Sequence, residues 1–326
     1  MRALLCHEWG SVEALVVGDI AAAQPGPGQV LIDVVATAVN YADAIMVSGN
    51  YQTRPPLPFA PGLETAGVVA ACGPGVTRVS VGQRVMALLH YGGMAEQALA
   101  DETDVWPVPE HMPFAEAAAF PVAYLSSDVA LRWQGRLAAG ETLLVLGAAG
   151  GVGLTAVEIG KAMGARVIAG ASSAEKLAAA REHGADDTVD YREEDLKARV
   201  LALTDGRGAD VCFDPIGGVL FDPALSSLGW GGRYLHVGFV GGVPQVPANR
   251  LLVKNRAALG SALRHYRWHA RDKLEESAQT LFGWYAEGRL RPLVTHRLPL
   301  ERGVEAIRLL TERRAHGRVL VDVAAA

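Results

Sequence analysis

A glycine-rich segment between an apolar run and an expected helix constrains this chain more than any other feature. Residues 147–153 read Gly-Ala-Ala-Gly-Gly-Val-Gly and follow the apolar run 142–146. Where such a turn joins a strand to a helix, its backbone can approach a pyrophosphate, which then lies at the helix N-terminus. Compared with the pattern GxGxxG, Ala148 replaces the first glycine, while Gly150 and Gly153 are present. A purely structural turn is the alternative. We expect four residues of this turn to contact a dinucleotide: Ala149, Gly150, Gly151 and Val152.

The sequence around this turn alternates between short apolar runs and helical patterns. Expected strands cover 142–146, 166–171, 189–191, 210–214 and 232–238. Helical patterns cover 153–163 and 174–183. Strands that alternate with helices of this length form right-handed βαβ units on a parallel sheet. The middle of the chain is therefore expected to be a Rossmann-type, doubly wound α/β domain.

The first part of the chain has a different pattern, with short strands and close turns. Expected strands cover 30–36, 67–71 and 84–89, whereas the proline-rich stretch 54–62 suits neither a helix nor a central strand. Short strands joined by Gly and Pro turns indicate a compact, barrel-like β domain. The 326 residues also exceed what one hydrophobic core usually supports, so two domains are expected.

Charge and composition exclude several classes of partner. The net charge is −5 and no long run of Lys or Arg occurs, so neither nucleic acid nor an anionic membrane is an expected partner. The uncharged stretch 142–157 is too short and too rich in glycine to span a bilayer. The N-terminus lacks the apolar core of a secretory signal, and Cys6, Cys72 and Cys212 are too scattered for a disulfide framework. A cytoplasmic protein is expected.

The residues after the second expected strand bear on the choice of cofactor. An NAD site places Asp or Glu about 20 residues beyond the glycine-rich turn, where it binds the ribose 2′-hydroxyl. This chain has Ser172 and Lys176 there, and Tyr191 adds a hydroxyl at the end of the third strand. These groups would bind the 2′-phosphate that a carboxylate would repel, which predicts NADPH. Ser172 and Glu175 also fit a helix capping box, and the two interpretations are compatible.

Several segments together resemble a known superfamily. Residues 39–43 (Val-Asn-Tyr-Ala-Asp), 49–51 (Gly-Asn-Tyr), 61–67 (Pro-Gly-Leu-Glu-Thr-Ala-Gly) and 147–153 follow the order of the medium-chain dehydrogenase/reductase superfamily. Within it, the chain looks like the zeta-crystallin-type NADPH:quinone oxidoreductases over nearly its whole length.

The resemblance implies a domain plan and an assembly. A GroES-like catalytic domain of the β-barrel type is expected over 1–122, completed by 265–326, and a Rossmann NADPH-binding domain over 123–264. Relatives of this kind are commonly homodimers paired through the nucleotide domain. We expect the stretch 237–247 to hold an edge strand that pairs across the two-fold axis.

The same resemblance argues against zinc. Zinc-dependent members have Cys where this chain has Asn40, and the His of a Gly-His-Glu pattern where it has Leu63. Neither side chain is a credible tetrahedral zinc ligand. The structural zinc lobe of those members uses four cysteines, yet none lies between Cys72 and Cys212. A zinc-free enzyme is therefore expected.

The resemblance also assigns residues to the catalytic domain's part of the site. It places Asn40, Asp43 and Tyr51 near the nicotinamide and the acceptor. The alternative for Asn40 and Asp43 is a capped helix start, and the alternative for Tyr51 is an ordinary packed aromatic residue.

Other residues are assigned to the cofactor. Ser126 stands where relatives have Thr near the nicotinamide amide, and Phe239 and Val240 match a loop over the nicotinamide. Asp128 departs from the Tyr of many relatives. Arg318 is a candidate contact for the cofactor phosphates, with a solvated face as its alternative.

These assignments lead to an expected activity. Without zinc to polarise it, the acceptor should itself be electrophilic, so we expect hydride transfer from NADPH to quinones or α,β-unsaturated carbonyls. His265 or Tyr266 is a candidate proton donor. One alternative is an acrylyl-thioester reductase, for which Arg264 and Arg267 are the candidate contacts to a coenzyme A phosphate. Another is a non-catalytic NADPH-binding protein of the crystallin or RNA-binding kind.

Overall fold

The computed structural model describes residues 1–323, and the chain divides into two units. The first unit runs from Met1 to Val122 and resumes at Pro292, and the second runs from Ala123 to Arg291. The second is built on a parallel sheet and the first on a largely antiparallel one. The predicted α/β class, with a Rossmann-type domain and a separate β-rich domain, is confirmed.

Six parallel strands form the sheet of the second unit, in the order β10-β9-β8-β11-β12-β13. Their bounds are β8 Thr142–Leu146, β9 Arg166–Ala171, β10 Asp187–Asp190, β11 Ala209–Asp214, β12 Leu228–His236 and β13 Ala257–Gly260. The chain adds strands on one side of β8, then crosses back and adds the rest from β11 outward. The strand order therefore reverses between β8 and β11, where such sheets bind ligands beyond the carboxyl ends of their strands.

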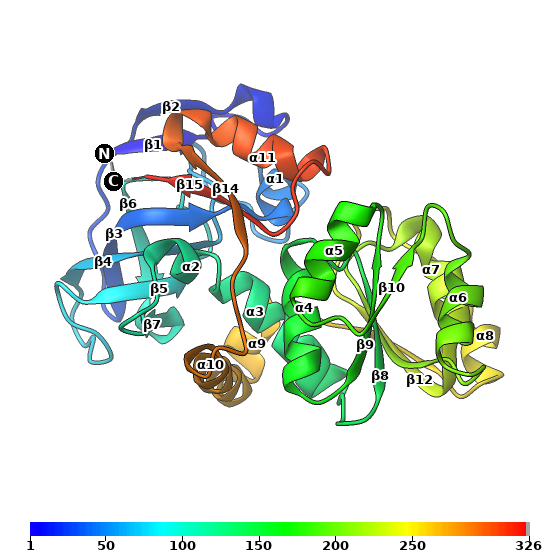
Figure 1. Ribbon diagram of the computed structural model, residues 1–326. Helices are drawn as coiled ribbons and strands as arrows, with labels where there is room; N and C mark the ends of the chain where they lie inside the picture. The colour runs from blue at the N-terminus through cyan, green and yellow to red at the C-terminus, as the bar shows by residue number, and fades with distance from the viewer. Residues whose placement is uncertain (324–326) are drawn as a thin grey trace. The chain divides into compact units, whose positions relative to one another are not determined.

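Helices cover both faces of this sheet. They are α3 Pro121–Asp128, the π-helical turn η3 Val129–Gln134, α4 Gly151–Ala162, α5 Ala174–Glu182, α6 Leu196–Leu203, the short 3-10 turn η4 Gly218–Leu220, α7 Phe221–Ser227, α8 Ala248–Leu252, α9 Leu263–His269 and α10 Arg271–Ala286. Figure 1 shows α4 and α5 on one face and α6 and α7 on the other. The central strand β8 is buried at every position because both faces of the sheet are covered.

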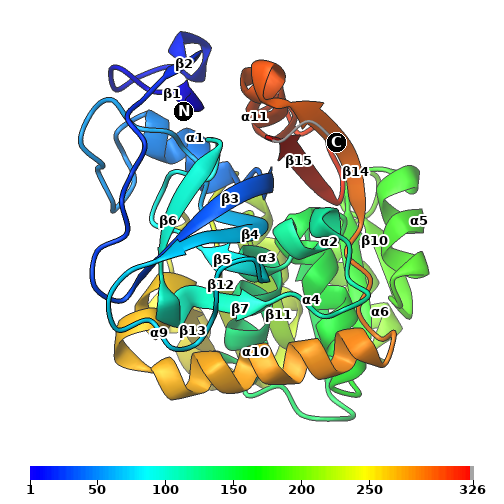
Figure 2. The ribbon, with the colours of Figure 1, turned by 90° about the vertical axis from the view of Figure 1, so that its left-hand side faces the viewer.

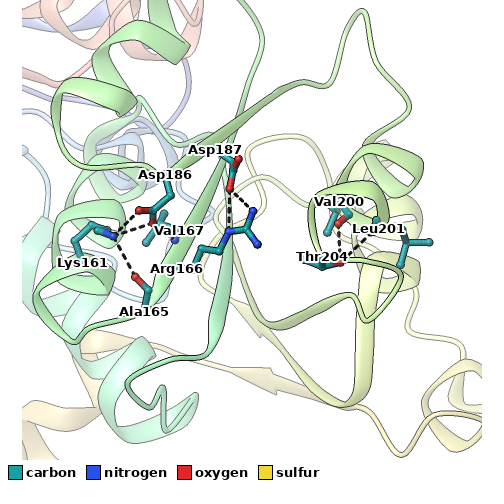
Figure 3. Close-up of polar contacts among 9 residues, drawn as sticks. All are labelled: Lys161, Ala165, Arg166, Val167, Asp186, Asp187, Val200, Leu201 and Thr204. Atoms are coloured by element: carbon teal, nitrogen blue, oxygen red, sulfur yellow. Dashed lines mark hydrogen bonds and ion pairs between the residues drawn. The ribbon is translucent and has the colours of Figure 1, made fainter.

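Charged residues hold the amino-terminal edge of β9 and β10 (Figure 3). Asp186 accepts from Lys161 Nζ at 2.7 and 2.8 Å and from the backbone N–H of Val167 at 2.7 Å. Beside it, Arg166 forms a 2.8 Å ion pair with Asp187. These contacts set the register of β10 on β9, and with it the place where both strands end.

The first unit contains a seven-stranded sheet and a two-stranded ribbon. The sheet has the order β14-β15-β3-β4-β5-β7, with β6 paired to β3, and β1 pairs with β2 in the ribbon. Figure 2 shows β3, β4, β5 and β7 side by side. The bounds are β1 Arg2–Leu5, β2 Val16–Asp19, β3 Gln29–Ala38, β4 Glu64–Cys72, β5 Arg84–Leu88, β6 Gln97–Asp101, β7 Val105–Pro107, β14 Val294–Pro299 and β15 Arg318–Asp322.

Short helices complete the first unit. They are η1 Val12–Ala14, α1 Tyr41–Val47, η2 Glu102–Asp104, α2 Phe114–Ala118, η5 Leu300–Arg302 and α11 Gly303–Thr311. The returning strand β15 pairs antiparallel with the end of β3, so that Leu320 lies opposite Ala38. This pairing brings the start of β15 close to the start of α1, although the two are far apart in the sequence.

The structure differs from two sequence-based expectations. We expected 265–326 to complete the first domain, but the units divide after Arg291, because α10 packs on η3 and Trp133 Nε1 donates to Ser277 Oγ at 3.0 Å. The expected edge strand within 237–247 is wrong. That stretch holds three glycines and two prolines and forms no strand, and the edge strand is β13.

Candidate functional site

Most of the predicted cofactor residues follow the carboxyl ends of parallel strands. Ala149, Gly150, Gly151 and Val152 follow β8, and Ser172 and Lys176 follow β9. Tyr191 follows β10, and Phe239 and Val240 follow β12. The carboxyl ends of parallel strands meet at one edge of a sheet, so these residues share the edge that such sheets use for ligands.

The glycine-rich turn is tightly packed at its first and last glycines. Gly147 has φ +58°, in the left-handed region that glycine adopts without strain. A Cβ at Gly153 would lie 2.1 Å from the Gly147 carbonyl oxygen, so only glycine lets α4 start this close to β8. Ala148 is fully buried, and its N–H donates to the Gly170 carbonyl at 3.0 Å. The alanine at the first glycine position therefore fills space inside the fold.

Gly150 faces a more open space. A Cβ on Gly150 would meet only the Gly147 oxygen, at 3.3 Å. Gly150 is the N-cap of α4 and supplies no side-chain capping bond, so the N–H groups of the first turn remain available to an anion. The turn thus fits a dinucleotide pyrophosphate.

The start of α5 differs by one residue from the expected capping box. Ser173, not Ser172, is the N-cap, and its hydroxyl accepts from the Lys176 N–H at 3.4 Å. The box is wrong because the helix begins one residue later than the pattern suggested. Ser172 is thereby left outside the helix, between β9 and the cap.

Tyr191 lies against the end of β9. Its N–H donates to the Ala171 carbonyl at 3.2 Å, and a Cβ on Gly170 would touch the ring at 3.4 Å. The phenol ring is thus carried to the same strand end as Ser172.

Ser126 is half-buried on α3, next to a serine that the sequence analysis did not single out. Ser127 is buried and donates to the Val152 carbonyl at 2.9 Å, and its hydroxyl lies 2.8 Å from that of Thr155. These bonds tie α3 to the first turn of α4. Ser126 therefore has a fixed position relative to the glycine-rich turn.

Asp128, the departure from the relatives' Tyr, has a structural partner. Its buried carboxylate takes a two-point contact from Arg132, with both distances 2.9 Å. Arg132 in turn lies over the Trp284 ring, 5.3 Å from its centroid. Arg132 occupies both oxygens of Asp128. The Asp128 carboxylate therefore stabilises the junction between α3 and η3.

The loop with Phe239 and Val240 is held by the loop after β11. Gly241 N–H donates to the Ile216 carbonyl at 2.7 Å, and Gly218 N–H donates to the Gly242 carbonyl at 2.8 Å. Ile216 also lies against Gly147 of the cofactor turn. The loops that follow β8, β11 and β12 therefore form one connected surface.

Buried polar residues that sequence reasoning missed support these loops. Asp214 accepts from the N–H groups of Ile216 and Gly217 at 2.7 and 2.9 Å and from the Tyr234 hydroxyl at 2.7 Å. Burial raises the pKa of Tyr234, so the phenol stays a donor. Within residues 1–323, neither ring nitrogen of His236 has a hydrogen-bond partner, and burial lowers its pKa.

In the first unit, Asn40 occupies the N-cap position of α1. An asparagine there usually accepts a hydrogen bond from the first turn, which is worth about 1 kcal/mol. Asn40 and Asp43 form a capping box, in which Asp43 Oδ2 accepts from the Asn40 N–H at 2.7 Å. The Asn40 amide also contacts Glu64 and Arg318. The alternative of a capped helix start is therefore supported for both residues.

Three side chains from different elements form a buried network. Asn40 Nδ2 donates to Glu64 Oε1 at 2.9 Å, and Arg318 Nη1 donates to Asn40 Oδ1 at 3.1 Å. Arg318 Nη2 completes the triangle with a short ion pair to the same Glu64 oxygen. Arg318 is buried, so the solvated face considered for it is wrong. Sequence reasoning assigned no role to Glu64, although this residue stands in the segment 61–67 that carries the family resemblance.

Asp43 is completely buried beside this network. Besides capping α1, it accepts from the Gly62 N–H at 3.0 Å. Burial raises the pKa of Asp43 to about 7, against the opposing effect of its two backbone hydrogen bonds. Asp43 therefore changes its charge near neutral pH.

Tyr51 lies partly buried against the apolar core of the first unit, a core that includes Val39, Met46, Phe59 and Leu63. The predicted residues thus form two groups. Asn40, Asp43, Tyr51 and Arg318 belong to the first unit, and all the other predicted cofactor residues belong to the second.

The two candidate proton donors have different surroundings. Tyr266 is buried, and burial raises its pKa while a side-chain hydrogen bond with Gln134 opposes that rise. His265 is exposed on α9 and lies 5.8 Å from the stacked ring of His269. Neither has a geometry that singles it out as the donor.

Between residues 1 and 323, no three or more His, Cys, Asp or Glu side chains gather in a way that would hold a metal ion. Over the same residues, no helix is long and apolar enough to cross a membrane.

Known families match both parts of the chain. The family described as "Alcohol dehydrogenase GroES-like domain" matches residues 26–110, and the family described as "Zinc-binding dehydrogenase" matches residues 151–280. The second match begins at Gly151, near the end of the glycine-rich turn, and covers the strands β9 to β13.

Similar proteins extend over the whole chain. A "Quinone oxidoreductase-like protein 2 homolog" from Nematostella vectensis is 37% identical, over 98% of this chain and 88% of the relative. The solved quinone oxidoreductase of Escherichia coli, complexed with NADPH, has a TM-score of 0.93 and 28% identity, over 99% of this chain and 100% of the other. That of Thermus thermophilus, described with and without NADPH, has a TM-score of 0.88 and 33% identity, with the same coverage.

Proposed function

The chain belongs to the medium-chain dehydrogenase/reductase superfamily, and from this premise we propose that it is a zinc-independent reductase that transfers hydride from NADPH to quinones or α,β-unsaturated carbonyls. As a member related to the quinone oxidoreductases, it is an oxidoreductase of the NAD(P)-binding kind. The choice of NADPH, the absence of zinc and the class of acceptor are the proposed parts.

The observation that carries the proposal is the buried network of Asn40, Glu64 and Arg318. Arg318 places a guanidinium directly beside Asn40, the residue at a zinc-ligand position of the metal-dependent branch. Asn40 would have to leave both of its partners to face a zinc ion, and a carboxamide is not among the ligands of tetrahedral zinc sites. Leu63, at the other ligand position, has no donor atom at all. These residues do not fit zinc, and no step of the reaction is assigned to a metal.

The lack of a fitting metal site bears on the acceptor. A bound metal would act as a Lewis acid that polarises an unreactive carbonyl. In its absence, an acceptor that is already electrophilic is favoured, as quinones and α,β-unsaturated carbonyls are. Both related quinone oxidoreductases with solved structures are consistent with this class.

The residues that would hold NADPH lie along the carboxyl edge of the second unit's sheet. We assign the pyrophosphate to Ala149, Gly150, Gly151 and Val152, the 2′-phosphate to Ser172, Lys176 and Tyr191, and the nicotinamide side to Ser126, Phe239 and Val240. When bound, NADPH supplies the hydride. The chain's own contribution is to fix the position of the dinucleotide through the first turn of α4 and to exclude water.

The first test is dinucleotide oxidation with a panel of quinones and enones, with a strong chelator present throughout. We expect turnover that selects NADPH over NADH and is unchanged by the chelator, with simple ketones inactive. Loss of activity with the chelator would contradict zinc independence. Turnover of simple ketones at the same rate would contradict the acceptor class.

A second prediction concerns Lys176. Lys176→Ala should raise the dissociation constant of NADPH about tenfold and change that of NADH less than about twofold, because only NADPH carries the 2′-phosphate that we assign to this ammonium. Lys197→Ala is the matched control, since Lys197 is an exposed lysine on α6 of the same unit. Equal effects of Lys176→Ala on the two dinucleotides, measured by titration of intrinsic fluorescence, would rule out this assignment.

A specific feature favours a second candidate, an acrylyl-thioester reductase. Residues 223–271 contain no Asp or Glu, and within this stretch α9 carries Arg264 and Arg267. Arg264 lies over the exposed Trp268 ring, 4.9 Å from its centroid. Cations beside an exposed indole suit the phosphates and adenine of coenzyme A. Including acrylyl-coenzyme A and its free acid in the panel separates the two candidates.

A homodimer paired through the second unit is also proposed. β13 is the edge strand of the parallel sheet, and large apolar side chains are exposed beside it at Trp230, Leu252 and Val253. The Gly231 N–H donates to the Lys254 carbonyl at 2.8 Å, which keeps these residues together. An open edge with apolar neighbours suits a second copy. A monomer mass in sedimentation velocity would contradict this proposal.

A cytoplasmic location completes the proposal. All three cysteines, Cys6, Cys72 and Cys212, are free thiols, and Cys6 and Cys212 are buried. Unpaired thiols suit a reducing compartment. Fractionation of the native host cells is the direct check.

A further inference from the structure

The segments that follow β11 and β12 each contain the tripeptide Gly-Gly-Val, at residues 217–219 and at residues 241–243. The two tripeptides lie backbone against backbone, because the Gly218 N–H donates to the Gly242 carbonyl at 2.8 Å. A Cβ at Gly218 would lie 2.1 Å from the Gly241 carbonyl oxygen, so only glycine allows this approach. The valine at the end of each tripeptide is therefore carried by closely packed backbone.

Both valines are exposed, together with other apolar side chains of the same segments. Val219 is 91% exposed and Val243 is 78% exposed, and Phe239 and Val246 are also exposed. The Phe239 ring lies beside the first tripeptide, since a Cβ on Gly217 would be 3.4 Å from it. We call Val219, Phe239, Val243 and Val246 the loop patch. Large apolar groups gathered in this way on a surface mark a binding site.

The segments that form the loop patch carry no charge. Residues 215–221 and 237–249 contain no Asp, Glu, Lys, Arg or His. A phosphate, a carboxylate or an ammonium group would lose hydration on this surface and gain no ion pair from these segments. The patch therefore suits a ligand group that is neutral and apolar.

The loop patch lies at the edge of the sheet where such folds bind ligands. Both segments leave the carboxyl ends of their strands, and β11 is next to the reversal of strand order. Phe239 belongs to the patch and is also one of the residues that we assign to the nicotinamide side. The patch is thus continuous with the cofactor part of the site, within one unit of the chain.

A second copy of the chain is the competing occupant, and another surface suits it better. Trp230, with Leu252 and Val253 beside it, lies near the start of β12, whereas the loop patch follows the end of that strand. From Trp230 to His236 the strand covers about 20 Å, at about 3.3 Å per residue. The apolar surface proposed for the dimer and the loop patch are therefore separate.

We propose that the loop patch binds an apolar chain of the acceptor, so that the preferred substrates are quinones or enones with an alkyl or prenyl substituent. This inference rests on the proposed function, because it assumes that such acceptors are reduced at the nicotinamide side of this unit. Each methylene removed from water strengthens binding about fourfold. A long chain that buries only two methylenes on the patch thus gains at least about tenfold in binding.

The experiment compares two benzoquinones with the same dimethoxy-methyl ring, one without a side chain and one with a decyl chain. We expect the wild type to have a kcat/KM at least about tenfold higher for the decyl compound. The gain should come from KM, because the chain is bound equally in the ground state and in the transition state. Val219→Ser/Val243→Ser should reduce the ratio of the two kcat/KM values to about two. The same ratio in wild type and variant would overturn the proposal.

Val81→Ser is the matched control for the loss of an exposed valine. Val81 is 65% exposed and belongs to the first unit, so its substitution should leave the ratio at the wild-type value. An equal reduction by Val81→Ser would show that the decyl chain binds without a specific site and would overturn the proposal. A smaller assembly for Val219→Ser/Val243→Ser in sedimentation velocity would also overturn it, because a second copy would then cover the patch.

A binding measurement on the wild type separates this proposal from the proposed function. In ¹H–¹³C spectra, the methyl signals of Val219 and Val243, assigned by their loss in the single serine variants, should shift on addition of the decyl quinone and not of the chain-free quinone. These shifts without turnover of either quinone would support the patch and contradict the proposed reductase. Turnover of both quinones without these shifts would support the reductase and overturn the patch.

Discussion

Replacing Gly153 by alanine is expected to lower the free energy of unfolding of the second unit by about 3 kcal/mol and to raise the dissociation constant of NADPH at least about 100-fold. The new Cβ would lie 2.1 Å from the Gly147 oxygen and 3.0 Å from the Ala148 Cα, so α4 has to move away from β8. Both contacts are to backbone atoms, which cannot rotate aside. The first turn of α4 would then no longer face the pyrophosphate.

Two other glycines of the same unit serve as controls. Gly150→Ala should leave the stability almost unchanged, because its Cβ meets only one atom, at 3.3 Å, yet it should weaken NADPH binding by obstructing the approach of the pyrophosphate. Gly283→Ala in α10 meets no atom within 4 Å and should stabilise the protein by about 1 kcal/mol without affecting binding. Thermal unfolding and fluorescence titration measure both effects. A Gly153→Ala protein as stable as wild type would show that the glycine-rich turn is not packed as described.

The second large effect is a dependence of stability on pH that comes from Asp43. Its pKa is 3.8 in an unfolded chain and about 7 in the folded protein. The folded state thus holds a proton that the unfolded state has lost, and the free energy of unfolding falls as pH rises between about 4 and 7. At about 1.4 kcal/mol per pH unit, the contribution lost over this window is about 4 kcal/mol.

Asp43→Asn isolates this contribution from those of other groups. Asparagine does not titrate, so the stability advantage of the wild type over the variant should shrink by about 4 kcal/mol from pH 4 to pH 7.5 and stay constant above that. The variant also has a constant cost of about 1–3 kcal/mol, since its amide nitrogen faces the N–H of Asn40 or Gly62. Urea unfolding at several pH values measures the difference. Parallel curves for the two proteins would mean that Asp43 is ionised throughout.

Local sequence patterns determined most of the second unit. The apolar run 142–146, the glycines after it and the helical pattern beyond them predicted β8, the turn and α4 to within two residues at the start of the helix. These elements are predictable because side-chain period, turn chemistry and strand–helix alternation act over a few neighbouring residues. The same patterns placed Ser172, Lys176 and Tyr191 after successive strand ends.

Other features depended on which of two locally possible structures the rest of the fold favours, and local patterns do not decide this. Both Ser172 and Ser173 suit an N-cap, and the structure uses the second. The stretch 237–247 has the β-branched residues of a strand, but its glycines and prolines and its bonds to the loop after β11 keep it irregular. In the sequence, Asp128 stands where many relatives have a Tyr near the cofactor. In the structure, its carboxylate forms an ion pair with Arg132 and belongs to the packing of the second unit.

The sequence by itself determined the fold class and the place of the glycine-rich turn, because side-chain period and turn chemistry act over a few neighbouring residues. Only the tertiary structure decided what Asn40 does. Its partners Glu64 and Arg318 lie 24 and 278 residues away, and the pairing of β15 with β3 is what brings Arg318 to it. The direction of a hydrogen bond depends on which donor faces which acceptor after folding, and no spacing along the chain records that.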